Sequence, residues 1–451
     1  MAREDPTILS RLVAECFGTF VLTFSVFCNV LGGSGPVFAA LSIASTLMVA
    51  VYALGEASGA HLNPAVSVAI SLCQQQKWST TIYYVAAQAL GGLLAAAFSF
   101  AIHGTSFKLE PGAGHSIWAA GTCELLFTCM LCFVVLNTAC AKANAGNQYF
   151  GLAIGYTIVA GGFAAGAISG ANLNPAISLA IDVSSASLYT SLAYIGFQLG
   201  GAALAAGLYK YCRPLDLAPS HLALAPAGLS EKLVAEFIGA FFLTLTAGLN
   251  VAQSVPSAAL SIAAALMSLV YALGSVSGAH LNPAVTCSVL LSRRNLLPPG
   301  DAMRYMLFQV FGAIAAACTC VGILGPSHTI GLAPPLTKSW TQLALTEAFF
   351  TFVLCLVVLT VATSIKAQSK DMFGLAIGSC VTVGGFAGAA VGAGVLNPAV
   401  AIGFDTAHSI FTEAKFMNSL FYTMSEVAGA SLAASVFYIT HTDDYVDETK
   451  V

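Results

Sequence analysis

One short stretch of sequence occurs four times along this chain and constrains its fold more than any other feature. The first copy is Ser58-Gly-Ala-His-Leu-Asn-Pro-Ala, and an identical copy covers residues 277–284. The copies at 169–176 and 392–399 are altered but keep Leu-Asn-Pro-Ala. Asn is a preferred N-cap residue, and Pro is tolerated in the first helical turn. Each copy therefore predicts an irregular loop that enters a helix at its Asn.

The composition places these loops in a membrane protein. Of the 451 residues, 57% are hydrophobic and only 8% are charged, which is too few to build a water-facing surface for a chain of this size. Membrane lipid is therefore an expected partner. Basic residues neither cluster nor alternate with aromatic ones, so nucleic acid is not an expected partner. Most of the 13 cysteines lie in apolar runs without metal-ligand spacing, and we expect no metal site and no cofactor.

Two lengths of apolar segment alternate along the chain. A helix that crosses a bilayer needs about 20 apolar residues. Segments of that length lie near 9–31, 38–56, 79–102, 116–140, 149–168, 187–211, 229–252, 256–275, 302–324, 340–363, 373–392 and 417–439. The four runs that begin at Asn-Pro-Ala are only about ten residues long, which is typical of re-entrant half-helices.

The second half of the chain repeats the first. Tyr52-Ala-Leu-Gly recurs at 271–274, and Gly151-Leu-Ala-Ile-Gly recurs at 374–378. Within each copy a weaker duplication pairs a membrane glutamate with the following loop; these glutamates are Glu15, Glu124, Glu236 and Glu347. Three spans separate the two halves of a copy, so the halves must have opposite orientations, whereas six spans separate the copies, which must be parallel.

The predicted fold is therefore an all-α membrane protein with two parallel modules, each an inverted repeat of six transmembrane helices and two half-helices. The modules cover 1–211 and 229–441. A proline-containing cytosolic linker, 212–228, is expected to be extended, and 442–451 forms a cytosolic tail. With both termini in the cytosol, every Lys and Arg except Lys108, Lys338 and Lys415 lies on the cytosolic side, as the positive-inside rule requires.

The chemistry of paired loops favours a passive pore. Non-helical backbone is tolerated in a membrane where it lines a water-filled cavity or is buried in protein. Two opposed loops can meet near the midplane, where the N-termini of their half-helices create a positive field. The Asn amides can donate hydrogen bonds into the lumen. Such a site accommodates a neutral hydrogen-bonding solute and repels a cation.

Twin Asn-Pro-Ala loops in a six-helix inverted repeat resemble the aquaporin, or major intrinsic protein, family, and the resemblance covers nearly the whole chain twice. It implies structural roles for the four glutamates, for Gln88 and Gln309, and for His61 and His280, which brace the loops. It also implies that the following residues line the pores at the midplane: Asn63, Pro64, Ala65, Asn174, Pro175, Ala176, Asn282, Pro283, Ala284, Asn397, Pro398 and Ala399.

The same resemblance implies an outer constriction of four residues in each module. These are Ile43, Gly162, Ala171 and Ile177 in the first module and Ile262, Gly385, Gly394 and Val400 in the second. Water-selective members have His at the second of these positions and Arg at the fourth. Here the constriction is expected to be apolar, wide and without a fixed positive charge, so that it passes larger neutral solutes or gases. In the alternative interpretation, Ile177 and Val400 plug the pores.

Two further acids need an explanation. Glu426 occupies the last predicted span, where the first module has Gln198, and an acid within a membrane is a candidate functional group. It is also consistent with a protonated side chain or one that faces a subunit interface. Glu56 lies beside the first loop, at the expected cytosolic mouth, and suits either a solvated rim charge or a bias of the entrance towards cations.

The predicted function is a channel for water, small neutral solutes or both, with one pore in each module. Relatives of the family assemble four modules, so two chains should form a homodimer with pseudo-four-fold symmetry. A secondary active transporter would also suit twelve spans, but it predicts one shared site and a coupling acid. A structural membrane protein that has lost conduction is the other alternative. An enzyme is not expected, because the chain shows no pairing of a nucleophile with a base.

Overall fold

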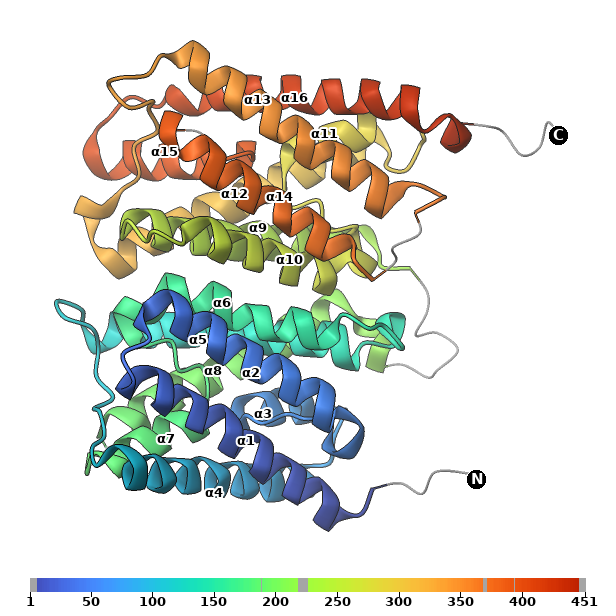
Figure 1. Ribbon diagram of the computed structural model, residues 1–451. Coiled ribbons are helices and arrows are strands. Elements are labelled where there is room, and N and C mark those ends of the chain that lie inside the picture. The colour runs from blue at the N-terminus through green and yellow to red at the C-terminus, as the bar shows by residue number, and fades with distance from the viewer. Residues whose placement is uncertain (1–5, 188, 218–225, 368–370, 393, 446–451) are drawn as a thin grey trace. The chain divides into compact units, whose positions relative to one another are not determined.

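The computed structural model describes residues 6–187, 189–217, 226–367, 371–392 and 394–445. The chain divides into two compact units, Met1–Ala225 and Pro226–Val451, each with its own bundle of helices (Figure 1). Parts of the expected linker (218–225) and tail (446–451) lie outside the described residues, as do Arg3, Lys370 and Lys450.

The described residues of the first unit form six long α-helices and two short ones. The long helices are α1 (Ile8–Leu31), α2 (Gly35–Ser58), α4 (Trp78–His103), α5 (Ile117–Val135), α6 (Phe150–Ser169) and α8 (Tyr189–Cys212). The short helices, α3 (Pro64–Leu72) and α7 (Pro175–Ser184), each begin at the Pro of an Asn-Pro-Ala loop.

The second unit repeats this order. Its long helices are α9 (Leu229–Ala252), α10 (Ala258–Ser277), α12 (Pro299–Leu324), α13 (Trp340–Val358), α14 (Phe373–Gly388) and α16 (Asn418–Thr440). Its short helices are α11 (Pro283–Leu291) and α15 (Pro398–Thr412). With 15 residues, α15 is longer than the run of about ten that the sequence predicts. It ends at Thr412, and Glu413, the next residue, has a left-handed φ of 58°.

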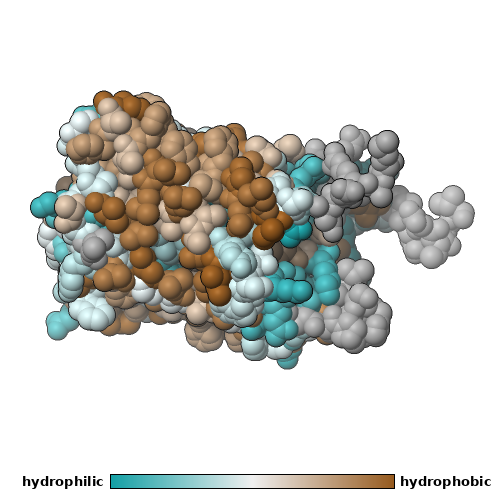
Figure 2. Space-filling view, turned by 90° about the horizontal axis from the view of Figure 1, so that it is seen from below, coloured by the Kyte–Doolittle hydropathy of each residue, from teal (hydrophilic) through white to brown (hydrophobic). Residues whose placement is uncertain are grey.

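Within the part of the chain that the structure describes, 12 helices are long and apolar enough to cross a membrane, which confirms the all-α fold. The described residues form no strand. Exposed side chains on these helices are often large and apolar, for example Ile82, Leu90, Leu94 and Phe98 on α4. Figure 2 shows apolar side chains across the middle of one face, with hydrophilic ones gathered towards its ends. This distribution suits a protein surrounded by lipid acyl chains.

The inverted repeat is visible in how the long helices cross. Helix α4 packs on α1, α8 on α5, α12 on α9, and α16 on α13. At each crossing one helix has a glycine whose added Cβ would collide with a backbone carbonyl of the other helix; these glycines are Gly91, Gly201, Gly312 and Gly429. Small residues at such crossings let helix backbones approach closely, which stabilises packing inside a membrane.

Some irregular segments differ from the sequence prediction. Helices α5 and α13 each end in a π-helical turn, Leu136–Cys140 and Leu359–Thr363. The start of the expected extended linker instead forms a short 3-10 helix, Pro214–Leu217. Asp216 in that turn is buried and accepts a hydrogen bond from the hydroxyl of Tyr209 at 2.6 Å. This part of the linker therefore packs onto the first unit.

Candidate pore and its constriction

Each Asn-Pro-Ala loop passes through the left-handed backbone region just before its Asn. The four leucines at that position, Leu62, Leu173, Leu281 and Leu396, have φ between 51° and 55°. Such values are uncommon for a residue with a Cβ and persist where the surrounding structure enforces them. The turn at each leucine leaves its carbonyl free to meet the opposite loop.

The asparagines join the two loops of each unit. Asn63 Nδ2 donates to the Leu173 carbonyl at 2.8 Å, and Asn174 Nδ2 donates to the Leu62 carbonyl at 2.9 Å. In the second unit Asn282 Nδ2 donates to Leu396 at 2.7 Å, and Asn397 Nδ2 donates to Leu281 at 2.9 Å. The two half-helices of each unit therefore meet at their N-termini through a reciprocal pair of hydrogen bonds.

The side-chain oxygen of each asparagine caps its own half-helix. The backbone N–H groups of Ala65, Ala176, Ala284 and Ala399 donate to these oxygens at 2.8 to 3.0 Å. This contact fixes which end of each amide carries the NH₂ group. Because one N–H of that group already bonds the opposite loop, a single N–H per asparagine is left to donate to a solute.

The membrane glutamates hold the loops from behind. Glu15 accepts backbone N–H groups of His61 and Leu62 at 2.9 and 2.8 Å, and the other three glutamates make equivalent bonds. All four are fully buried. The loop histidines are also braced: His61 Nδ1 lies 3.0 Å from Ser67 Oγ, and His280 Nδ1 lies 3.1 Å from Thr286 Oγ1.

Four tyrosines also hold the loops in place, and they were not predicted from the sequence. Their hydroxyls donate to loop carbonyls at 2.7 to 2.9 Å; these tyrosines are Tyr84, Tyr194, Tyr305 and Tyr422. Each lies four residues, about one helical turn, before Gln88, Gln198, Gln309 or Glu426 on the same helix. That fixed spacing is a signal in the sequence, since residues four apart share a helix face.

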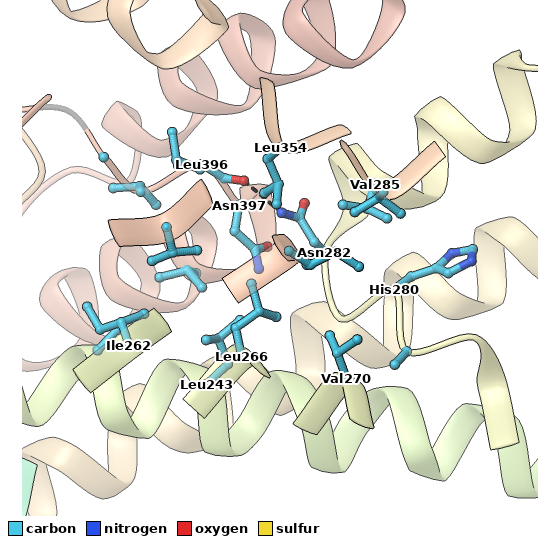
Figure 3. Close-up of a pocket in the computed structure, with 18 of the residues that line it drawn as sticks. Leu243, Ile262, Leu266, Val270, His280, Asn282, Val285, Leu354, Leu396 and Asn397 are labelled. Carbon is cyan, nitrogen blue, oxygen red and sulfur yellow. Dashed lines mark hydrogen bonds between the residues drawn. The ribbon is translucent and has the colours of Figure 1, made fainter. Parts of the chain in front are cut away.

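The second unit contains a cavity of about 90 Å³ along these loops. That is room for several water molecules. In Figure 3, Asn282 and Asn397 lie between His280 at one end and Ile262 at the other. Among the described residues that line the cavity, these two asparagines and His280 supply the polar side chains, and the rest are apolar or glycine.

The structure brings three of the four predicted constriction residues of the second unit to this cavity: Ile262, Gly394 and Val400. Val400 is also buried in an apolar cluster with Phe404. Gly385 is not among the lining residues. A Cβ on Gly385 would lie 2.8 Å from the Ala259 Cβ, so this glycine allows α14 to approach α10 closely. The space that a missing side chain would leave is therefore taken partly by a neighbouring helix.

The first unit has the same arrangement around Gly162, whose added Cβ would lie 3.1 Å from the Ala40 Cβ on α2. Ala171 adopts a left-handed φ of 49°, and Ile177 is buried with 3% of its surface exposed. Ile43, on α2, is half-buried. In both units the constriction glycine, Gly162 on α6 or Gly385 on α14, allows a close contact between two helices as well as any widening of the pore.

The two unexplained acids lie in different surroundings. Glu426 is fully buried, and its Oε1 accepts the backbone N–H of Asn397 at 2.8 Å. It is therefore not isolated on its helix, and the interpretation that it faces a subunit interface is wrong. Glu56 is exposed in the last turn of α2, just before the first loop.

Twelve apolar helices and paired re-entrant loops define a multi-pass membrane channel. The chain belongs to the major intrinsic protein family, whose model matches residues 3–184, 145–253 and 247–438. It is 35% identical over 214 residues to aquaporin NIP1-1 of Oryza sativa subsp. japonica. The aligned region covers 46% of this chain and 75% of that relative. The chain is 33% identical over 243 residues to aquaporin NIP2-1 of Zea mays, and that alignment covers 51% of this chain and 79% of that relative.

A solved structure is also similar. The X-ray structure of the aquaglyceroporin from Plasmodium falciparum aligns with a TM-score of 0.43 and 22% identity, covering 47% of this chain and 99% of that one. The repeated matches to the family model agree with a tandem fusion of two family modules. The protein is an integral membrane channel of a family that carries water and small solutes.

Proposed function

We propose that each module has its own pore and conducts small neutral solutes through a constriction that is apolar and lacks arginine. The observation that carries this proposal is the cavity of the second unit, which Ile262, Gly394 and Val400 line beside Asn282 and Asn397. An apolar constriction offers a solute no fixed positive charge and few hydrogen bonds, so discrimination by size and hydration dominates. A Cβ added to Gly162 or Gly385 would lie close to Ala40 or Ala259, so neighbouring helices take up part of the space that the missing side chains leave. We therefore expect small solutes to be favoured over large polyols.

Arginine substitutions at the two constrictions test this proposal. Ile177→Arg and Val400→Arg each place a cation and several donors beside a pore. Each single variant should narrow the range of neutral solutes that cause swelling of proteoliposomes in stopped-flow light scattering, and the double variant should narrow it further. An unchanged solute range in the double variant, at equal reconstituted protein, would show that the constriction lies elsewhere or that these pores do not conduct.

We further propose that two chains form a homodimer of four modules with both termini in the cytosol. The charge distribution supports this orientation, because every Lys and Arg except Lys108, Lys338 and Lys415 falls in a segment that this topology assigns to the cytosol. Native mass spectrometry in detergent should give a mass of two chains. A monomer or a tetramer of chains would contradict the dimer, and protease access to terminal tags in sealed vesicles tests the orientation.

A non-conducting structural role is the second candidate, supported by the burial of Ile177 and Val400 at 3% and 5% exposure. Against it, the asparagine contacts of both loops are intact in both units, and the second unit keeps an open cavity. Proteoliposomes that swell no faster than protein-free liposomes for every solute would favour this candidate.

A further inference from the structure

Three of the four loop-bracing sites share one set of hydrogen-bond donors. Glu15 accepts from the Ser58 hydroxyl at 2.6 Å and from Gln88 Nε2 at 2.8 Å, besides the two backbone N–H groups. Glu124 and Glu236 have the equivalent hydroxyl and glutamine donors. Four donors compensate a buried carboxylate for lost hydration, so each of these three sites is matched to an acceptor-only group.

The glutamine in each of these sites also has a second acceptor. Gln88 Nε2 donates to Ser67 Oγ at 2.9 Å as well as to Glu15. Gln198 and Gln309 donate in the same way to Ser178 Oγ and Thr286 Oγ1, each at 3.0 Å. The two hydrogens of the amide group therefore match two acceptors, a carboxylate and a hydroxyl.

The fourth site departs from this pattern at three positions at once. Gly392 replaces the serine that donates to the glutamate, Glu426 replaces the glutamine, and Ala401 replaces the hydroxyl residue. Glu347 accepts three backbone N–H groups, from Gly394, Val395 and Leu396 at 2.7, 3.0 and 3.0 Å. Glu426, which in its ionised form can only accept hydrogen bonds, thus stands where the other three sites have a glutamine donor.

Glu426 is incompletely satisfied as an anion. Its Oε1 accepts the Asn397 N–H, whereas its Oε2 is buried and has no hydrogen-bond partner among the described residues. Its exposed fraction is 0%, as is that of Glu347. A buried carboxylate with a single donor is costly, and the Glu347 carboxylate, which accepts the adjoining N–H groups of the same loop, adds like-charge repulsion.

Among the residues that the structure describes, the other titratable groups near the pair supply no positive charge. Tyr422 lies one turn from Glu426 on α16 and donates to the Gly392 carbonyl. Cys355 on α13 is close enough to Glu426 to interact with it electrostatically, and Cys287 on α11 is close enough to interact with Cys355. Asp405 on α15 bonds the start of α16 at Ser419 instead. Two buried negative charges with no cation among the described neighbours are costly, and one bound proton would remove this cost.

We propose that Glu347 and Glu426 bind one proton between them, and that loss of this proton lowers conduction through the second pore. Glu347, with three N–H donors, is the anion, and Glu426 is the acid whose O–H replaces the glutamine donor. A carboxylic acid has one O–H and needs one acceptor, which agrees with the loss of the second acceptor at Ala401.

The pair is placed to act on the pore. The four backbone N–H groups that it holds belong to Gly394, Val395, Leu396 and Asn397, and all four residues line the cavity. A second negative charge would push the carboxylates apart and displace this loop, including the asparagine that faces the lumen. This inference rests on the proposed function of the second pore as a conducting one.

The test compares the full-length wild type with two single variants, Glu426→Gln and Gln198→Glu. Glu426→Gln restores the glutamine of the other three sites, and Gln198→Glu installs the acid in the first module. The readout is the ratio of solute permeability at about pH 5 to that at about pH 9 in stopped-flow swelling of proteoliposomes, a range that spans carboxyl titration at ordinary and buried sites.

In the wild type, permeability should fall at high pH by up to about one half, because only one of two pores responds. The ratio should approach one in Glu426→Gln and should exceed the wild-type ratio in Gln198→Glu. Equal ratios in the wild type and Glu426→Gln would overturn the coupling between the proton and the pore.

Infrared difference spectroscopy tests the proton without relying on conduction. The wild type should show the C=O stretching band of a buried protonated carboxylic acid, which Glu426→Gln lacks and which disappears as pH rises. If no solute permeates any variant while this band is present, the proposed function fails and the proton site stands. Absence of the band from the wild type would overturn the proton site itself.

Discussion

At the residue scale, the asparagine of each loop has three tasks that only its side chain combines. Its oxygen caps the half-helix, one N–H bonds the opposite loop, and the other N–H is left for a solute. Aspartate would keep the cap but lose both donors and add a negative charge. The donor geometry, rather than the helix start alone, therefore explains why the motif needs Asn.

Asn174→Asp tests this division of tasks. The variant should fold, because Asp caps helices as well as Asn, but the Leu62 carbonyl loses its partner at a cost of about 1–3 kcal/mol. Neutral-solute permeability should fall, and cation conductance should appear in planar-bilayer recordings. Asn174→Ala is the matched control, since it also loses the donors but adds no charge and should not admit cations. Equal cation currents from both variants would contradict a role for the added charge.

Gly394 is a second residue with a defined conformational role. Its φ is +114°, and an added Cβ would lie 3.0 Å from the Gly385 Cα and 3.1 Å from the Gly384 carbonyl oxygen. Gly394→Ala should cost about 1–3 kcal/mol through backbone strain and should reduce flux through the second pore. Thermal unfolding in detergent and swelling rates measure the two effects. Ala171→Gly, at the equivalent position of the first module, should change both much less; a larger effect there would contradict this explanation.

At the scale of elements, a buried ion pair connects segments that are distant in the sequence. Arg294 follows α11 and bonds Asp444 after α16 at 2.7 Å, with 5% and 2% of the two side chains exposed. The same guanidinium donates to the Thr363 carbonyl at the π-helical end of α13 and lies over the Phe437 ring. Burial lowers the pKa of Arg294, and the Asp444 carboxylate opposes that shift. One side chain thereby ties three helix ends together.

Arg294→Ala should therefore destabilise the protein strongly. Removing one partner of a buried pair typically costs about 3–5 kcal/mol, since the other charge is left unpaired. Arg304→Ala is the control, because Arg304 pairs with Asp301 at 3.0 Å on the surface, with 56% and 28% of the side chains exposed. Exposed pairs contribute about 0–1 kcal/mol. A smaller loss of thermal stability for Arg294→Ala than for Arg304→Ala would contradict the assigned role.

Local patterns allowed the helices and loop starts to be predicted, whereas contacts between distant elements could not be. The Asn-Pro pair fixes a helix start through its own cap and ring, so the starts of all four half-helices follow from sequence. The contact of Gly385 with Ala259 and the pairing of Arg294 with Asp444, 150 residues away, depend on tertiary packing. The width of the constriction depends on such contacts as well, and the wide apolar constriction expected from the sequence stays a prediction.

At the scale of the whole molecule, duplication has allowed the four loops to diverge. Three loops keep the same hydrogen-bonding set, and the fourth has lost its serine, glutamine and second hydroxyl while keeping Asn-Pro-Ala. One chain therefore carries two modules with the same fold and different loop chemistry. We expect the two pores to differ in their response to pH rather than in their basic architecture.

The most direct test of the central claim is stopped-flow swelling of proteoliposomes containing the full chain, with water, glycerol, urea and larger polyols as solutes. We predict faster swelling than in protein-free liposomes for water or the smaller neutral solutes, with the effect declining as solute size increases. Swelling rates that equal those of protein-free liposomes for every solute would contradict a conducting channel.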